Sequence, residues 1–166
     1  MATTATTFGA IRDKLVTTIQ DLTPARLAHE LFRYAPRVGV EYLSGTDLRG
    51  WAEDNDGSCF RLFDITVGTT APAGMSDEDI QREEAVLEVV LCYPVHLAKY
   101  GSDNSGEMAD FMEQDIRQIR ASIGVHGAAN WVSGATPKLP EDVSYEDGEG
   151  VRFAVLRLGC EYYYDT

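Results

Sequence analysis

The feature that most constrains the fold is residues 151–164, VRFAVLRLGCEYYY, a long β-type run close to the end of the sequence. A strand so near a chain end stays ordered only when it is paired into a sheet. Its alternate residues from Ala154 to Tyr162 are apolar or aromatic, which predicts one core-facing side. We therefore expect an integral sheet strand, with residues 143–145 as its hairpin partner across a loop at 146–150.

Other segments carry the hydrophobic period of an amphipathic helix, in which apolar residues recur every three or four positions. The first such segment spans residues 8–22. The second spans residues 105–123, and Gly124 follows its last periodic residue, where helices commonly end. A shorter helix is expected over residues 24–32, because a Thr-Pro pair at its start has the pattern of an N-cap followed by proline.

The central strands are predicted from runs rich in Val, Ile, Leu and Phe, which favour a pleated and half-buried surface. Residues 59–67 and 85–95 form such runs, and residues 38–43 form a weaker one. Between them lie polar stretches at residues 44–58 and 68–83. We expect both stretches to be long loops, the second with room for one helical turn.

These elements together predict an α+β fold: a mostly antiparallel sheet packed against two main helices, with long loops. Residues 125–142 are expected to be irregular, with Trp131 packed on the core. We expect residues 1–6 to be a flexible N-terminal tail and residues 7–166 to be a single domain, a length that provides a proper hydrophobic core.

The chain is strongly acidic, with 14 Lys and Arg against 27 Asp and Glu and a formal net charge of −13. This balance argues against tight binding to the phosphate backbone of nucleic acids, which requires clustered cations. The longest apolar run, residues 89–95, is too short to span a bilayer, and the first residues lack the features of a secretion signal. We therefore expect a protein made inside the cell, without a membrane partner.

The residues show no pattern that predicts reaction chemistry. The cysteines are Cys59, Cys92 and Cys160, and the histidines are His29, His96 and His126. The cysteines are too far apart in sequence for a metal-ligand motif and suit small buried apolar side chains. No histidine belongs to a ligand cluster or a nucleophile–base motif. We expect no enzyme activity, no metal and no cofactor, the alternative being a small hydrolase that uses His96 with nearby carboxylates.

Segments along most of the chain have the pattern of one structural family. They are FGAIRDKLV at residues 8–16, EVVLCY at 88–93, MADFMEQDI at 108–116, and RFAVLRL at 152–158 leading to EYY at 161–163. In order and type these elements, an opening helix, a mid-chain strand, a central helix and a closing strand, resemble the tail terminator proteins of long-tailed bacteriophages. The sequence differs from the usual plan by its longer N-terminal half, with the inserted-looking loops noted above.

The resemblance implies a structural virion protein without catalytic residues. Such proteins form a hexameric ring that caps the finished tail tube, stops its polymerisation and joins it to the head or neck. The implied partners are other copies of the chain, the tail tube protein and a neck or head-completion protein, and the implied location is the virion. DNA would pass through the ring without specific binding, which an acidic lumen suits because like charges repel.

Subunits of such a ring meet head to tail, so two different surfaces must fit each other. We expect these surfaces in the long loops, at the sheet edge and at the closing tyrosines, a residue type enriched at interfaces. The candidate interface residues are Asp47, Arg49, Trp51, Asp54, Asp56, Met75, Asp77, Asp79, Tyr163 and Tyr164. Deleting residues 70–80 is then expected to leave a folded monomer that no longer assembles. The alternatives are another neck or head–tail connector protein and a monomeric acidic binding module.

Overall fold

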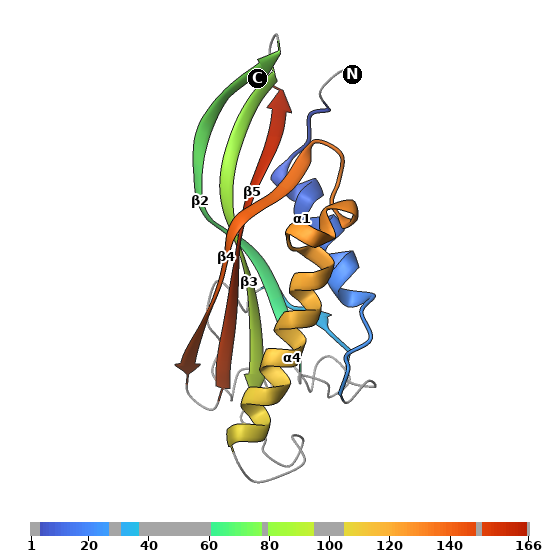
Figure 1. The fold of residues 1–166 in the computed structure, drawn as a ribbon, viewed down its shortest axis with the longest axis vertical. Coiled ribbons are helices and arrows are strands. Elements are labelled where there is room, and N and C mark those ends of the chain that lie inside the picture. Colours follow the sequence, from blue (N-terminus) through green and yellow to red (C-terminus); the bar gives the residue numbers. More distant parts are fainter. Residues whose placement is uncertain are drawn as a thin grey trace.

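The computed structural model describes residues 4–26, 31–36, 61–77, 80–94, 105–148 and 151–165 (Figure 1). The elements in chain order are α1 (Phe8–Gln20), β1 (Arg33–Tyr34), β2 (Leu62–Asp77), β3 (Ile80–Pro94), α4 (Ser105–Ile123), the 3-10 helix η2 (Val125–Asn130), β4 (Ala135–Gly148) and β5 (Val151–Asp165). The predicted α+β class is confirmed, because the structure contains a mostly antiparallel sheet and two main helices.

The described strands form one five-stranded sheet with the order β1-β2-β3-β5-β4. β1 runs parallel to β2, and every other neighbouring pair is antiparallel. β5 lies between β3 and β4 and pairs with both over most of its length. The prediction that the closing run is an integral sheet strand is therefore confirmed, and its hairpin partner β4 is longer than predicted.

Both long helices lie on one side of the sheet, which we call the helix face (Figure 1). Thr7 caps α1, since its Oγ1 accepts a hydrogen bond of 3.1 Å from the amide of Ala10. Apolar side chains of α1 and α4 are buried against the strands in one continuous core. The predicted core-facing side of the closing strand is confirmed, and its residues in this core are Ala154, Leu156, Leu158, Cys160 and Tyr162.

The other side of the sheet, here called the outer face, carries a smaller apolar cluster. Its members are Ala35, Leu62, Val90, Cys92, Val151, Phe153 and Val155. Phe153 and Val155 alternate with the core residue Ala154, so they point to the side of the sheet away from the helices. The outer face is therefore buried at one half of the sheet.

The predicted long loop over residues 68–83 is wrong for its described parts, because residues 68–77 belong to β2 and residues 80–83 belong to β3. Pairing with β3 continues along β2 to Asp77, which faces Ile80. Gly, Pro, Thr and Ala dominate this part of β2, so its local sequence does not have the pattern of a strand. Three register shifts also interrupt its pairing with β3. Its extended conformation therefore depends on pairing with β3 rather than on its own sequence. The expected helical turn after Ser76 is not seen in its described parts, because Asp77 ends β2 and Ile80 begins β3, while residues 78–79 lie outside the described residues. A deletion of residues 70–80 would remove paired strand residues.

The expected irregular stretch over residues 125–142 is wrong for its second half, which forms the start of β4. The sequence does not predict this strand because it contains Pro137 and Pro140. Proline is tolerated here because β4 is an edge strand, where the missing N–H is not needed for pairing. The prediction for Trp131 is confirmed: its ring is buried in the core, and its Nε1 donates a hydrogen bond of 2.8 Å to the carbonyl oxygen of Ile123.

The predicted short helix over residues 24–32 is not seen in its described parts, because residues 24–26 and 31–32 are not helical. The weak strand at 38–43 and the loop at 44–58 lie outside the described residues. Gly124 follows α4 as predicted, and its amide donates a hydrogen bond of 2.7 Å to the carbonyl oxygen of Arg120. Within the described ranges, no helix is both long and apolar enough to cross a membrane.

Candidate assembly surface

The outer face changes from apolar to polar along β5. Phe153 and Val155 are buried in the smaller cluster, whereas Arg157, Gly159 and Glu161 follow on the same side of the strand. The neighbouring strand β3 changes in a similar way, because Glu88 faces Arg157 and Glu84 faces Glu161, with Val86 between them. One half of the outer face is therefore a polar surface, which we call the polar half.

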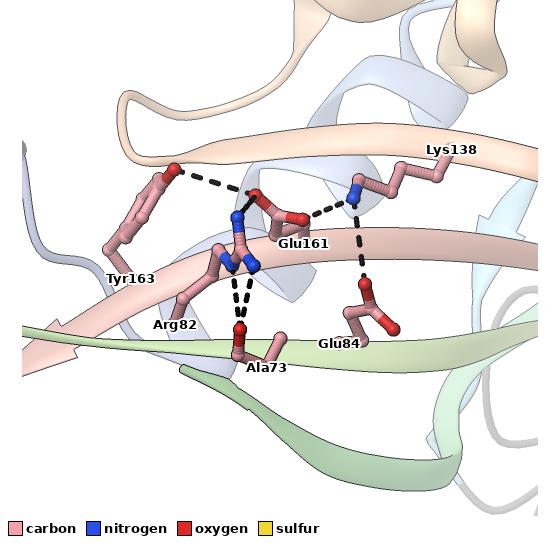
Figure 2. A network of polar contacts seen from close by, with 6 residues as sticks. All are labelled: Ala73, Arg82, Glu84, Lys138, Glu161 and Tyr163. Carbon is pink, nitrogen blue, oxygen red and sulfur yellow. Dashed lines mark hydrogen bonds and ion pairs between the residues drawn. The ribbon is translucent and has the colours of Figure 1, made fainter. Parts of the chain in front are cut away.

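Glu161 is the centre of a network that joins several strands of the polar half (Figure 2). Its carboxylate forms an ion pair with Lys138 of β4 and another, at 3.7 Å, with Arg82 of β3. It also accepts a hydrogen bond of 3.4 Å from the hydroxyl of Tyr163. Lys138 Nζ lies 3.6 Å from the carboxylate of Glu84 as well. The hydrogen bond to Glu161 raises the pKa of Lys138, so the ammonium group keeps its charge to higher pH.

Arg82 connects the second half of β2 to this network. Its Nε and Nη2 donate to the carbonyl oxygen of Ala73 at 3.2 and 2.6 Å (Figure 2). Ala73 lies at a register shift between Pro72 and Gly74, where a β-bulge leaves a backbone group without its ladder partner. The guanidinium therefore supplies the missing donor and at the same time links β2 to Glu161.

A second group of ion pairs lies nearer the apolar half. Arg157 is 3.5 Å from Glu88 and 3.7 Å from Asp142, and its Nη1 donates a hydrogen bond of 2.9 Å to Ser144 Oγ. Both groups alternate positive and negative side chains across the strands. The polar half is thus close to neutral, although the whole chain carries a net charge of −13.

A trough of about 500 Å³ crosses the polar half between these two groups of ion pairs. Thr69, Val86, Gly159 and Lys138 lie in one row across the strands and line it. Gly159 places no side chain in this row, and a Cβ at this position would lie 3.2 Å from the carbonyl oxygen of Lys138. The trough is therefore lined by small side chains and bordered by charged ones.

Leu139 and Pro140 protrude at the β4 end of the trough. They lie at the register shift between Lys138 and Glu141, so neither has a paired residue on β5. Leu139 is 74% exposed, more than any other large hydrophobic side chain in the part of the chain that the structure describes. The bulge explains this exposure, because it turns the unpaired residues away from the sheet.

A second hollow, of about 430 Å³, lies where the N-terminal segment meets the end of β5. Its lining residues are Ala5, Thr6, Thr7, Phe8, Glu83, Tyr162, Tyr164 and Asp165. The hydroxyl of Tyr164 donates a hydrogen bond of 2.7 Å to Gln81 Oε1, and the amide of Thr6 donates one of 2.6 Å to the carbonyl oxygen of Tyr163. Tyr164 therefore forms a hydrogen bond with β3, and Tyr163 forms one with the N-terminal segment of the same chain.

The structure places only some of the predicted interface residues. Met75 and Asp77 belong to the end of β2, and Tyr163 and Tyr164 belong to β5. The predicted residues outside the described ranges are Asp47, Arg49, Trp51, Asp54, Asp56 and Asp79. The structure brings Tyr163 into the Glu161 network, and it leaves the assignment of all these residues to a subunit interface as a prediction.

The residues of the network and trough were not predicted as a site from the sequence. The signal was the alternation Arg82-x-Glu84-x-Val86, which places these side chains on one face of a strand. The predicted loop over residues 68–83 divided this pattern and concealed it. At Leu139 the neighbouring prolines concealed a strand in the same way.

The structure describes some of the cysteines and histidines that were considered for catalysis or metal binding. Cys92 and Cys160 are buried, as expected for small apolar side chains, and burial raises the pKa of Cys160 to about 12. His126 is exposed on η2. Cys59, His29 and His96 lie outside the described residues. No protein-family model matches the sequence, and no curated protein matches it either.

Proposed function

We propose that this protein is a structural virion protein of the tail terminator type, whose copies form a ring that caps the tail tube and joins it to the head or neck. The proposal rests on the order of elements, which resembles that family, and on an α+β fold of the expected kind. The observation that carries it is the position of β5, which pairs with β3 and β4 beside an open polar half.

The polar half suits a contact surface between subunits. Its side chains are held by ion pairs that connect β3, β4 and β5 and by hydrogen bonds from Arg82 to β2, so the surface is ordered before any partner arrives. An ordered surface loses less conformational entropy on binding than a mobile one. The net charge of −13 suits the passage of DNA through a ring, because an acidic lumen repels the phosphate backbone.

The proposal is tested by the mass of the purified protein in the presence of the tail tube protein that the proposal implies. Sedimentation velocity is expected to show assembly of the 18.3 kDa chain into a species with the mass of a hexamer on the tube, and negative-stain images are expected to show rings at tube ends. Tubes should stop growing when the protein is added. A chain that stays monomeric in this mixture and leaves tube length unchanged would contradict the proposal and favour the monomeric binding module.

A further inference from the structure

We propose that Leu139 of one copy of this chain inserts into the trough of another copy, at the β2 end lined by Thr69, Thr70 and Ala71. Leu139 is 74% exposed at the opposite, β4 end of its own trough. A large apolar side chain so exposed gains free energy when a partner covers it. This contact rests on the proposed function only in its symmetry, because a ring requires the head-to-tail arrangement.

The trough has the shape and lining that a leucine side chain requires. Thr69 and Ala71 present small side chains at its β2 end, and Val86 provides an apolar floor beside them. Gly159 has no side chain to fill the middle. Apolar anchors that enter such pockets carry most of the binding free energy of many interfaces, while the charged residues around them exclude water.

A second copy is the occupant because the same surface presents both parts of the contact. The protruding Leu139 and the trough adjoin, so a copy of the chain offers each part to the other. The charges agree with this arrangement. Lys138 precedes Leu139 with a side chain that is 42% exposed, and Glu84 lines the trough with a side chain that is 57% exposed. Lys138 pairs with Glu84 of its own chain at 3.6 Å, and insertion of Leu139 brings the same two groups of different copies near each other, so this pair can also form between copies.

The symmetry of the contact follows from whether it is made once or twice between the same two copies. If both leucines insert reciprocally, the contact is isologous and yields a dimer. If each leucine inserts into the next copy in one direction, the contact is head to tail, and it closes a ring when the rotation between successive copies closes. The same residues meet in both cases, and the ring requires the second arrangement.

The first experiment compares Leu139→Asp with Tyr145→Asp by sedimentation over a range of concentrations, with and without tail tube protein. Tyr145 is a matched control, because it is 45% exposed on the same strand and does not line the trough. Leu139→Asp is expected to weaken self-association by about tenfold or more, as loss of a central anchor does, and Tyr145→Asp is expected to leave it unchanged. Equal assembly of Leu139→Asp and the unsubstituted chain overturns the proposal.

The second experiment joins two copies covalently. A mixture of Leu139→Cys and Thr69→Cys chains, treated with a short bis-maleimide, is expected to give a crosslinked heterodimer, whereas Tyr145→Cys mixed with Thr69→Cys is not. The unsubstituted chain measures the background from its own cysteines. A crosslink between the two chains supports this contact in either arrangement, and the native mass of the assembly then distinguishes a reciprocal dimer from a ring. Rings that form without the crosslink contradict this contact and leave the ring proposal intact.

Discussion

Arg61 Nε donates a hydrogen bond of 2.7 Å to Asp115 Oδ2, and both side chains are buried. The hydroxyl of Tyr93 donates to the same oxygen at 2.8 Å, and Arg61 Nη2 donates to the carbonyl oxygen of Arg26 at 2.6 Å. Burial raises the pKa of Asp115, while its contacts with Arg61 and Tyr93 act in the opposite direction. This buried pair connects the sheet, α4 and the segment that follows α1.

Replacing Asp115 by asparagine is expected to destabilise the protein by about 3 to 5 kcal/mol, because it removes one carboxylate from a buried ion pair with Arg61. The free energy of unfolding measured in urea checks this value. Glu113→Gln is the control: Glu113 pairs with Arg117 at 2.5 Å on the surface of α4, and exposed pairs contribute less than about 1 kcal/mol. Equal effects of the two substitutions would contradict the importance of burial.

Replacing Glu161 by glutamine is expected to lower the unfolding free energy by about 1 kcal/mol, since the neutral amide loses its ion pairs with Lys138 and Arg82. The effect should concentrate at the hairpin, where amide hydrogen exchange near Ala73 is expected to become faster. Glu146→Gln provides a control, because Glu146 is exposed on β4 and forms no ion pair with any described residue. Unchanged exchange at the hairpin would show that the network does not stabilise it.

Replacing Gly124 by alanine is expected to destabilise the protein by about 1 to 3 kcal/mol through overpacking. A Cβ at this position would lie 2.5 Å from the carbonyl oxygen of Arg120 and 2.7 Å from the carboxylate of Glu141. Its φ of −75° is ordinary, so space rather than backbone conformation requires glycine here. Gly9→Ala in α1, where the nearest atoms are 3.9 Å away, is expected to stabilise by up to about 1 kcal/mol. Thermal unfolding of both variants distinguishes these effects.

Removing the Cys160 thiol is expected to change how stability depends on pH. The folded chain holds this proton up to a pKa of about 12, whereas the unfolded chain releases it near the ordinary value of 9.0. Above pH 9 the folded state therefore binds more protons, and the unfolding free energy falls as pH rises, by up to about 1.4 kcal/mol per pH unit. Between pH 9 and 10.5 the unsubstituted chain should lose about 1 to 2 kcal/mol more than Cys160→Ala. Parallel pH curves for the two proteins would contradict this account.

The sequence by itself determined the elements whose pattern is local. Apolar residues at helical spacing predicted α1 and α4, and the alternation from Ala154 to Tyr162 predicted both β5 and its core-facing side. These predictions succeeded because each segment buries one face, so its period records which residues are covered. The absence of a comparable period in residues 68–77 explains why the same reasoning expected a loop there.

Only the tertiary structure decided the long hairpin, the start of β4 and the polar half of the outer face. The second half of β2 is a strand because β3 pairs with it, and the start of β4 is a strand because β5 pairs with it despite two prolines. Lys138 and Glu161 are 23 positions apart in the sequence, so no local sequence pattern predicts their contact. Strand pairing and ion pairs depend on partners that are distant along the chain, whereas a hydrophobic period is a property of the segment itself.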